Sequence, residues 1–338
     1  MNGWIGPIIR VAKTSKAENG TNQGRGTLTG YNVSTTSAEG AWLMKTELMP
    51  AMVKSFFRAG SIVAPSLVAD LALRLFCTPF PAGGLSKQQR NMADRARLKL
   101  ASSQQRRLHY STGDIQTYEF SARPHSANNG TVLLVHGWTG DSRYMLAFVD
   151  PLVELGFDVI CFDLPAHGRS SGRTTNLVEC ARALARVASH FDNIHAIVAH
   201  SFGGPVTAVA LSRAFEDATD IDVRKIVLLA SPNESADLVK NFGDSLGLNE
   251  LAQMELEREF EIICGYRLAD FTGSKFFGRL GHPLLVVHSE DDAEVSFQHG
   301  LAYRSLPNCK FVPLNGVGHR DILYSSKAIR SVARFLSQ

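Results

Sequence analysis

The sequence predicts an α/β fold in which an eight-stranded, mostly parallel sheet carries helices on both faces. From about residue 107 onward, short apolar runs suited to buried strands alternate with amphipathic helical patterns. Such alternation is typical of a parallel sheet covered on both faces. The chain has 338 residues, of which 44% are hydrophobic and 20% are charged, so it can bury a full core.

The first 43 residues predict a disordered leader. Gly, Asn, Ser and Thr are concentrated between residues 18 and 40, and little hydrophobic periodicity is present. Charges such as Arg10 and Lys13 interrupt the first thirty residues, which contain no long apolar core. No secretory signal is therefore predicted, and the expected location is the cytoplasm.

Residues 44–106 predict an N-terminal helical extension. The longest uncharged stretch of its apolar part, residues 59–69, has eleven residues, whereas about 20 are needed to span a bilayer. We expect amphipathic helices that pack on the core, with association at a membrane surface as the less favoured alternative. Residues 86–107 are rich in Lys, Arg and Gln and predict a solvated helix.

Eight strands are predicted in the rest of the chain, and the first two form a hairpin. Residues 108–111 and 115–121 flank a Thr-Gly-Asp turn. Six apolar runs follow, at residues 131–135, 158–162, 194–199, 225–230, 284–288 and 309–314. Residues 176–191 have helical apolar spacing behind Asn176, which predicts a capped amphipathic helix.

Ser201 is the candidate nucleophile, because it lies where the apolar run 194–199 meets a helix start at Gly203 and Gly204. A nucleophile elbow needs small neighbours, since the chain turns sharply and holds the central residue in a strained conformation. Ala199 stands where the G-x-S-x-G pattern has its first glycine. The alternative interpretation is a buried small residue at a strand end.

Further motifs surround this elbow in a fixed order. Residues 133–140 (LLVHGWTG), 162–170 (FDLPAHGRS), 287–292 (VHSEDD) and 316–319 (GVGH) each follow or end a predicted strand. Together with the elbow they resemble the α/β-hydrolase-fold serine hydrolases of the serine aminopeptidase and monoacylglycerol-lipase-like group, close to bacterial HGW-type hydrolases of unassigned substrate. The resemblance covers about residues 107–338. It implies the α/β-hydrolase fold with a short helical lid, here at about residues 231–282.

A serine hydroxyl needs a base to accept its proton, and the base needs an ionised carboxylate partner. His319, on a Gly-rich loop, is the candidate base because imidazole titrates near neutrality. The resemblance implies Asp292 as the carboxylate, with Asp291 and Glu290 as competitors. The order Ser201, Asp292, His319 is the order of this fold.

The resemblance also implies an oxyanion hole made by two backbone N–H groups, those of Trp138 and Phe202. Phe202 follows the nucleophile at a helix N-terminus, where the helix dipole favours negative charge. The indole of Trp138 either walls the pocket or packs in the protein interior. The sequence alone does not decide between these two interpretations of the indole.

Other polar residues have a structural interpretation. His136, His167 and His200 are expected to be hydrogen-bonded histidines, and Asp163 is expected to fix a turn. No metal-ligand spacing and no nucleotide-binding glycine motif is present, so neither a metal nor another cofactor is expected. A net charge of +3 does not indicate nucleic-acid binding, and five widely spaced cysteines indicate free thiols.

The predicted function is a cofactor-independent serine hydrolase, foremost a carboxylesterase that acts on short or medium acyl esters through an acyl-enzyme on Ser201. Two alternatives remain: a serine aminopeptidase or lipase-like hydrolase, and a non-catalytic protein of the same fold that binds a ligand or partner. The expected partner is a small-molecule ester. The sequence does not predict an oligomeric state.

Overall fold

The computed structural model describes residues 51–80, 87–123, 128–212 and 220–338. The predicted leader at residues 1–43 and the start of the extension at residues 44–50 lie outside this part of the chain. None of the helices described there is both long enough and apolar enough to cross a bilayer.

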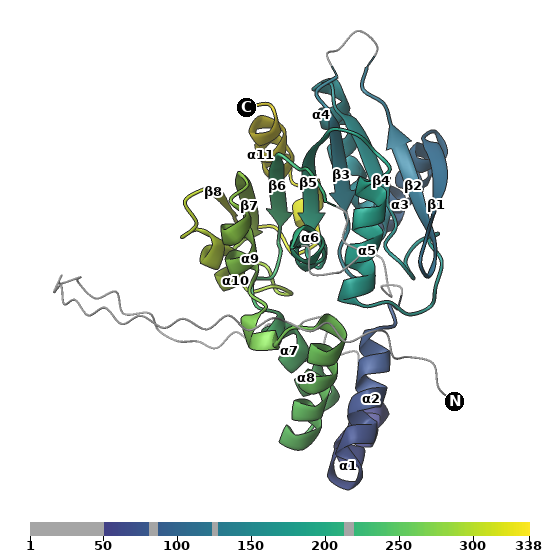
Figure 1. Cartoon of the computed structure of the whole chain (residues 1–338), viewed down its shortest axis with the longest axis vertical. Helices are drawn as coiled ribbons and strands as arrows, with labels where there is room; N and C mark the ends of the chain where they lie inside the picture. Colours follow the sequence, from purple (N-terminus) through teal and green to yellow (C-terminus); the bar gives the residue numbers. More distant parts are fainter. Residues whose placement is uncertain (1–50, 81–86, 124–127, 213–219) are drawn as a thin grey trace, which may run out of the picture. The chain divides into compact units, whose positions relative to one another are not determined.

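Eight strands form one sheet in the order β1-β2-β4-β3-β5-β6-β7-β8 (Figure 1). β2 pairs antiparallel with β1 and β4, and all other neighbours are parallel. The strands are β1 (Gln104–Tyr110), β2 (Gly113–Phe120), β3 (Thr131–Val135), β4 (Asp158–Phe162), β5 (Ile194–His200), β6 (Lys225–Leu229), β7 (Leu284–Ser289) and β8 (Cys309–Leu314). The predicted fold class is confirmed.

β1 begins at Gln104, earlier than the predicted start at residue 108. The solvated helix predicted at residues 86–107 is correspondingly shorter, since α3 (Lys87–Ala101) ends before the strand. The reason is that residues 104–107 are polar and exposed at the sheet edge, so hydrophobic periodicity gives no strand signal there.

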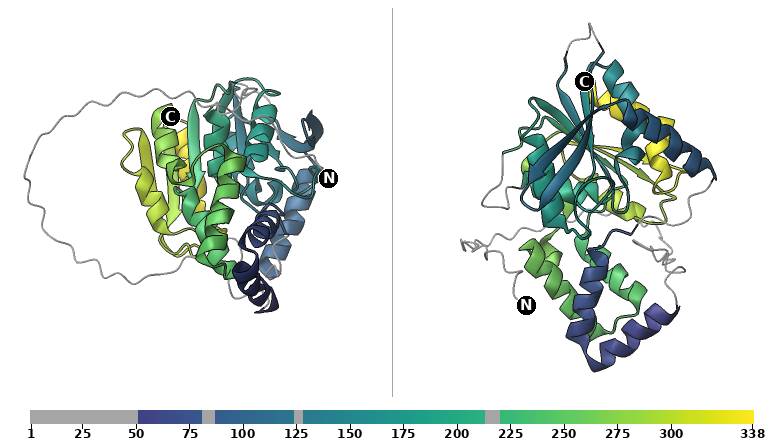
Figure 2. Two further views of the ribbon diagram at one scale, coloured as in Figure 1. Left: turned by 60° about the horizontal axis from the view of Figure 1, so that its bottom comes forward. Right: turned by 90° about the vertical axis from the view of Figure 1, so that its right-hand side faces the viewer.

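Helices cover both faces of the sheet (Figure 2). Leu133 and Val135 of β3 belong to a core with α5 (Leu177–Ala188) and α6 (Gly203–Leu211), whereas Val132 and Leu134 belong to a core with α4 (Val149–Glu154) and α11 (Ser326–Leu336). The alternation follows from the two-residue period of a strand. α5 begins as predicted behind Asn176, whose side chain accepts a hydrogen bond from the N–H of Glu179 at 2.9 Å.

The N-terminal helices pack on the lid rather than on the sheet. α1 (Ala51–Val63) and α2 (Pro65–Phe76) lie beside α7 (Ser235–Leu246) and α8 (Glu250–Cys264), beyond the ends of the parallel strands (Figure 1). The four helices and the short 3-10 helix η3 (Leu268–Asp270) share a separate hydrophobic cluster, formed by Phe57, Val68, Ala69, Ala72, Leu73, Val239, Phe242, Leu246, Leu256, Phe260 and Leu268. For α1 and α2 the expectation that the extension packs on the main core is wrong, because their apolar faces pack on the lid. For α3 the expectation is confirmed, since its Leu100 belongs to the core on one face of the sheet.

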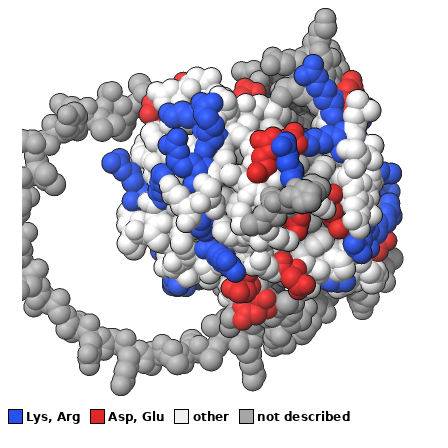
Figure 3. Space-filling view, turned by 90° about the horizontal axis from the view of Figure 1, so that it is seen from above, with Lys and Arg blue, Asp and Glu red and all other residues white. Residues whose placement is uncertain are grey.

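The remaining helices lie close to β7 and β8. α9 (Gly273–Leu280) precedes β7, and α10 (Phe297–Tyr303) connects it to β8. On the face seen in Figure 3, acidic side chains lie between two groups of basic ones.

Candidate active site

Ser201 lies in a strained turn between β5 and α6. Its φ of +51° falls in the left-handed region, which non-glycine residues adopt rarely and which is characteristic of functional sites. Gly203 is required next to it, because a Cβ there would lie 2.7 Å from the carbonyl oxygen of Val135. The methyl group of Ala199 fits in the fully buried core on the α6 side, so the elbow forms without the usual first glycine.

Three predicted side chains meet at the carboxyl edge of the sheet. His319 Nε2 is 2.9 Å from Ser201 Oγ, and His319 Nδ1 is 2.8 Å from Asp292 Oδ2. Ser201 follows β5, Asp292 follows β7 and His319 follows β8, so parallel strands bring them to one edge. All three residues are buried. Hydroxyl, imidazole and carboxylate therefore form one hydrogen-bonded series.

The environment of Asp292 favours its ionised form. Burial acts to raise the pKa of this carboxyl, but hydrogen bonds from His288 and His319 outweigh burial and hold the pKa below its usual range. The other carboxylate oxygen, Oδ1, accepts the backbone N–H groups of Glu294 at 2.9 Å and Val295 at 2.8 Å. The carboxylate is thus both fixed and negative beside the imidazole.

The two competing acids lie elsewhere on the same turn. Asp291 Oδ2 accepts the N–H of Gly316 at 2.6 Å, and Glu290 Oε2 accepts a hydrogen bond from Asn315 at 3.4 Å. Both carboxylates are exposed. The structure brings Asp292, and not these neighbours, to the imidazole.

The loop at Gly137 lies directly against the nucleophile, since a Cβ at this glycine would be 2.9 Å from Ser201 Cβ. This close approach places the backbone of Trp138 near Ser201, and Phe202 follows the serine at the start of α6. The indole of Trp138 lines the cavity at Ser201 and contacts the ring of Phe202 edge-on, with centroids 5.0 Å apart. Both interpretations of the indole hold in the structure, since it lines the cavity and also packs against the main core.

The histidines expected to be structural hold the backbone around the site. Their hydrogen bonds are from Leu164 N to His136 Nε2 (2.9 Å), from Thr139 N to His167 Nε2 (3.3 Å), from His167 Nδ1 to Pro165 O (2.8 Å) and from His200 Nε2 to His319 O (3.0 Å). Burial lowers the pKa of all three histidines, to about 3 for His167 and His200. They are neutral supports of the loops that carry the site.

Asp163 supports the site in the way expected from its turn motif. Its carboxylate accepts hydrogen bonds from the N–H of Ser142 at 2.9 Å, the hydroxyl of Ser142 at 2.6 Å and the N–H of Arg169 at 2.8 Å. The loops after β3 and β4 are joined through this residue. Within the described part of the chain, no group of three or more His, Cys, Asp and Glu residues is placed to hold a metal ion.

The cavity at Ser201 contains a residue that sequence reasoning missed. Phe76, the last residue of α2, lines this cavity together with the predicted site residues. Among the described residues, the lining consists of Phe76, Trp138, Thr139, His200, Ser201, Phe202, Leu238, Glu294, His319 and Arg320. No motif marks Phe76, because its position depends on how the extension packs on the lid.

Fold and site together define a protein with the α/β-hydrolase fold, as the sequence motifs indicated. The profile of the family described as "alpha/beta hydrolase fold" matches residues 130–253. A curated relative, the dihydrolipoyllysine-residue acetyltransferase component of the acetoin cleaving system of Cupriavidus necator, is 40% identical over 82 residues. That match covers 23% of this chain and only 21% of the relative.

Solved structures with this fold resemble the chain over most of its length. A bromoperoxidase from Bacillus anthracis has a TM-score of 0.51 and 17% identity, and covers 70% of this chain and 100% of its own. A putative lipase from Acinetobacter baumannii (TM-score 0.54, 18% identity) covers 75% and 97%. Est1E from Butyrivibrio proteoclasticus, solved with ferulic acid bound (TM-score 0.54, 18% identity), covers 69% and 96%. These likenesses show the fold.

Proposed function

We propose that this protein is a serine hydrolase that cleaves carboxylic esters through an acyl-enzyme on Ser201. The observation that carries the proposal is the unbroken series from Ser201 Oγ through both ring nitrogens of His319 to Asp292 Oδ2. Each distance is that of a hydrogen bond in the arrangement by which an imidazole activates a serine.

The chemistry follows from these contacts. As Ser201 Oγ attacks the ester carbonyl, its proton moves to His319 Nε2, and Asp292 stabilises the resulting imidazolium. Collapse of the tetrahedral intermediate breaks the bond to the alkoxy group, which leaves as an alcohol with the proton from His319. Water then attacks the acyl-serine, and His319 accepts its proton. Collapse of the second tetrahedral intermediate breaks the bond to Ser201 Oγ, which takes the proton back from His319, and the acid is released.

The negative charge on the carbonyl oxygen needs stabilisation during both steps. The N–H groups of Phe202 and Trp138 are the proposed donors, because the turn after Ser201 and the loop at Gly137 both lie against the nucleophile. A well-placed donor contributes about 3 to 4 kcal/mol to such a transition state. The N-terminus of α6 adds a favourable dipole at Phe202.

The cavity supports an ester in preference to a peptide with a free amino end. A carboxylate is the side chain that pairs with such an ammonium group by opposite charge. Glu294 lines the cavity, but its Oε1 lies 3.8 Å from Arg320 Nε. This carboxylate therefore already forms an ion pair with a guanidinium group. The aromatic and aliphatic lining at Phe76, Trp138 and Leu238 suits an apolar acyl group.

A binding protein without catalysis is the second candidate, and the backbone of Ser201 argues against it. Holding a non-glycine residue at a φ of +51° costs of order 1–3 kcal/mol. A protein that only binds a ligand gains nothing from this strain or from a buried imidazole and carboxylate aligned on the hydroxyl. The strain is useful when the serine must be exposed to substrate as a nucleophile.

The test is hydrolysis of 4-nitrophenyl esters, from acetate to decanoate, by the whole chain. We expect turnover of at least one ester and its loss by about 10⁴-fold or more in Ser201→Ala. Ser189→Ala, at an exposed serine, is the matched control and should retain full turnover. Equal turnover by Ser201→Ala and the unmodified protein would refute the proposed nucleophile, and no turnover of any ester would refute the esterase activity.

A further inference from the structure

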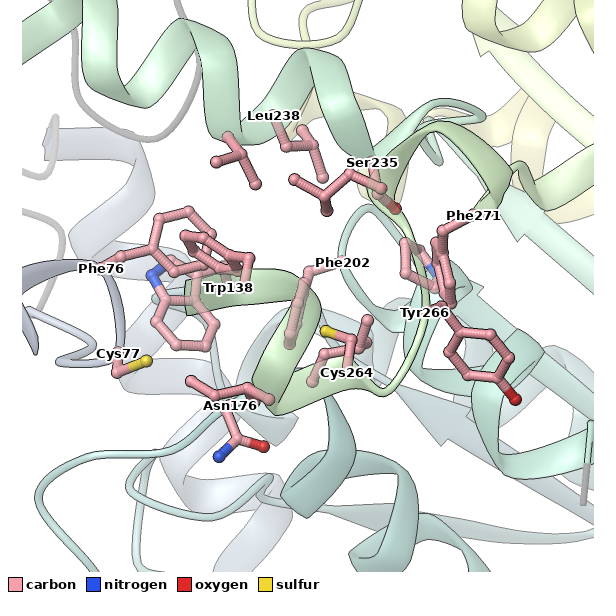
Figure 4. Close-up of a pocket in the computed structure, with 16 residues that line it drawn as sticks. Phe76, Cys77, Trp138, Asn176, Phe202, Ser235, Leu238, Cys264, Tyr266 and Phe271 are labelled. Atoms are coloured by element: carbon pink, nitrogen blue, oxygen red, sulfur yellow. The ribbon is translucent and has the colours of Figure 1, made fainter. Parts of the chain in front are cut away.

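Figure 4 shows a second, apolar cavity of the structure. It shares lining residues with the cavity at Ser201 and therefore adjoins it. Four side chains line both cavities and therefore stand at their boundary: Phe76, Trp138, Phe202 and Leu238. Beyond this boundary the second cavity is lined mainly by apolar side chains of the lid, among them Val239, Phe260, Ile263 and Phe271.

Among the described residues that line the second cavity there is no Asp, Glu, Lys, Arg or His. The side-chain oxygen of Asn176 accepts the cap hydrogen bond of α5 from Glu179. Burial raises the pKa of the thiols of Cys77 and Cys264 to about 12, so both remain uncharged at neutral pH. The chemistry of the cavity therefore suits a hydrocarbon group, since each buried CH₂ contributes about 0.8 kcal/mol.

Phe76 is held at the boundary from three sides. Its ring stacks on Trp138 with centroids 5.8 Å apart and an interplanar angle of 26°. It also meets two lid rings edge-on, Phe242 at 5.0 Å and Phe260 at 4.7 Å. The N-terminal extension thus supplies a fixed aromatic wall between Ser201 and the second cavity.

Phe76, like Leu238 of α7, is a boundary residue that lies outside the segments next to the nucleophile. Trp138 and Phe202 belong to the two backbone segments next to the nucleophile, and their replacement would disturb the reaction itself. Phe76 comes from α2, outside the sheet and its connections. Shortening its side chain would remove part of the boundary between the two cavities and leave the backbone at Ser201 in place.

We propose that the second cavity is the subsite for the acyl chain of the substrate and that Phe76 determines how long a chain it admits. The proposal rests on the proposed esterase function. A short acyl group fits beside Ser201, whereas a longer aliphatic chain has to pass the ring of Phe76. Acyl-chain selectivity is therefore set by the N-terminal extension together with the lid.

The experiment compares kcat/KM for 4-nitrophenyl acetate and decanoate. Phe76→Ala should raise the ratio of decanoate to acetate activity by roughly tenfold or more, mainly through a lower KM for decanoate, because several methylenes gain access to an apolar pocket. Leu71→Ala is the control, since Leu71 lies on the same helix with its side chain 44% exposed. In Leu71→Ala the ratio of decanoate to acetate activity should equal that of the unmodified protein.

A second pair of variants keeps the test decisive if Phe76→Ala fails to fold. Phe76→Leu should raise the decanoate-to-acetate ratio, because leucine is smaller than phenylalanine and leaves more room between the two cavities. Phe76→Trp should lower the ratio, because the larger indole leaves less room. Ratios that do not change, or that change in the same direction in both variants, would overturn the proposal. Absence of all ester turnover in the unmodified protein would instead count against the proposed function.

Discussion

His319 Nε2 lies 2.9 Å from Ser201 Oγ, although 118 positions separate the two residues in the chain. The parallel order β5, β6, β7, β8 produces this contact, because the turns after these strands all open at one edge of the sheet. The same edge supplies Asp292 from the turn after β7. The topology thus assembles a hydroxyl, a base and an acid from three separate turns.

Replacement of the buried acid tests its assignment. Asp292→Asn should lower kcat for ester hydrolysis by about 10³- to 10⁴-fold, because the neutral amide no longer fixes the tautomer of His319 or stabilises its charged form. Asp291→Asn is the matched control, since this neighbour is exposed and bonds the N–H of Gly316. Steady-state kinetics on both variants provide the measurement. A larger loss of kcat in Asp291→Asn would show that Asp291, and not Asp292, is the acid.

The loop at Gly137 provides a test of the proposed oxyanion hole. Gly137→Ala should reduce kcat by about 10²-fold, because the added methyl would lie 2.9 Å from Ser201 Cβ and push the loop away from the nucleophile. Gly281→Ala is the comparison, since no heavy atom lies within 4 Å of a Cβ there. At its φ of +70° the control should lose about 1–2 kcal/mol of stability and no activity.

Kinetics combined with urea unfolding distinguish the two glycine variants. Activity loss in Gly137→Ala should exceed the loss explained by unfolded protein at the assay temperature. Similar kcat values for both variants would argue against a role of this loop in the reaction.

The buried histidines predict how stability depends on pH. His167 and His200 have pKa values lowered from 6.5 to about 3 in the fold, so the unfolded chain binds more protons between these values. The free energy of unfolding should therefore fall as the pH falls below 6.5, by up to about 1.4 kcal/mol per pH unit for each histidine. Urea unfolding at pH 7, 6 and 5 measures this slope.

Substitution identifies the groups responsible for that slope. His167→Gln should make the dependence on pH shallower, whereas His109→Gln, at a side chain that is 83% exposed, should leave it unchanged. A stability that is independent of pH between 7 and 5 would show that these histidines are not held neutral in the fold.

Residues with a local signal were predictable from the sequence. The elbow needs small neighbours around Ser201, and the buried strands appear as short apolar runs, so both leave a pattern in the chain. The cap of α5 at Asn176 was predictable for the same reason. These features depend mainly on neighbours in sequence.

Features that depend on distant packing left no such signal. The first residues of β1 are polar because they form an exposed edge, and the apolar faces of α1 and α2 do not reveal that their partner is the lid. Phe76 is one aromatic residue among many until α2 places it against Trp138. Its part in the pocket follows only from the assembled structure.

Reaction with a fluorophosphonate, followed by mass spectrometry of the labelled peptides, tests directly whether Ser201 is the nucleophile. We expect one covalent adduct on Ser201 in the folded protein and no adduct in Ser201→Ala. We also expect strongly slowed labelling in Asp292→Asn, because the base is no longer held in the right form. An adduct on another residue, or labelling that persists in folded Ser201→Ala, would contradict the assignment of Ser201 as the nucleophile.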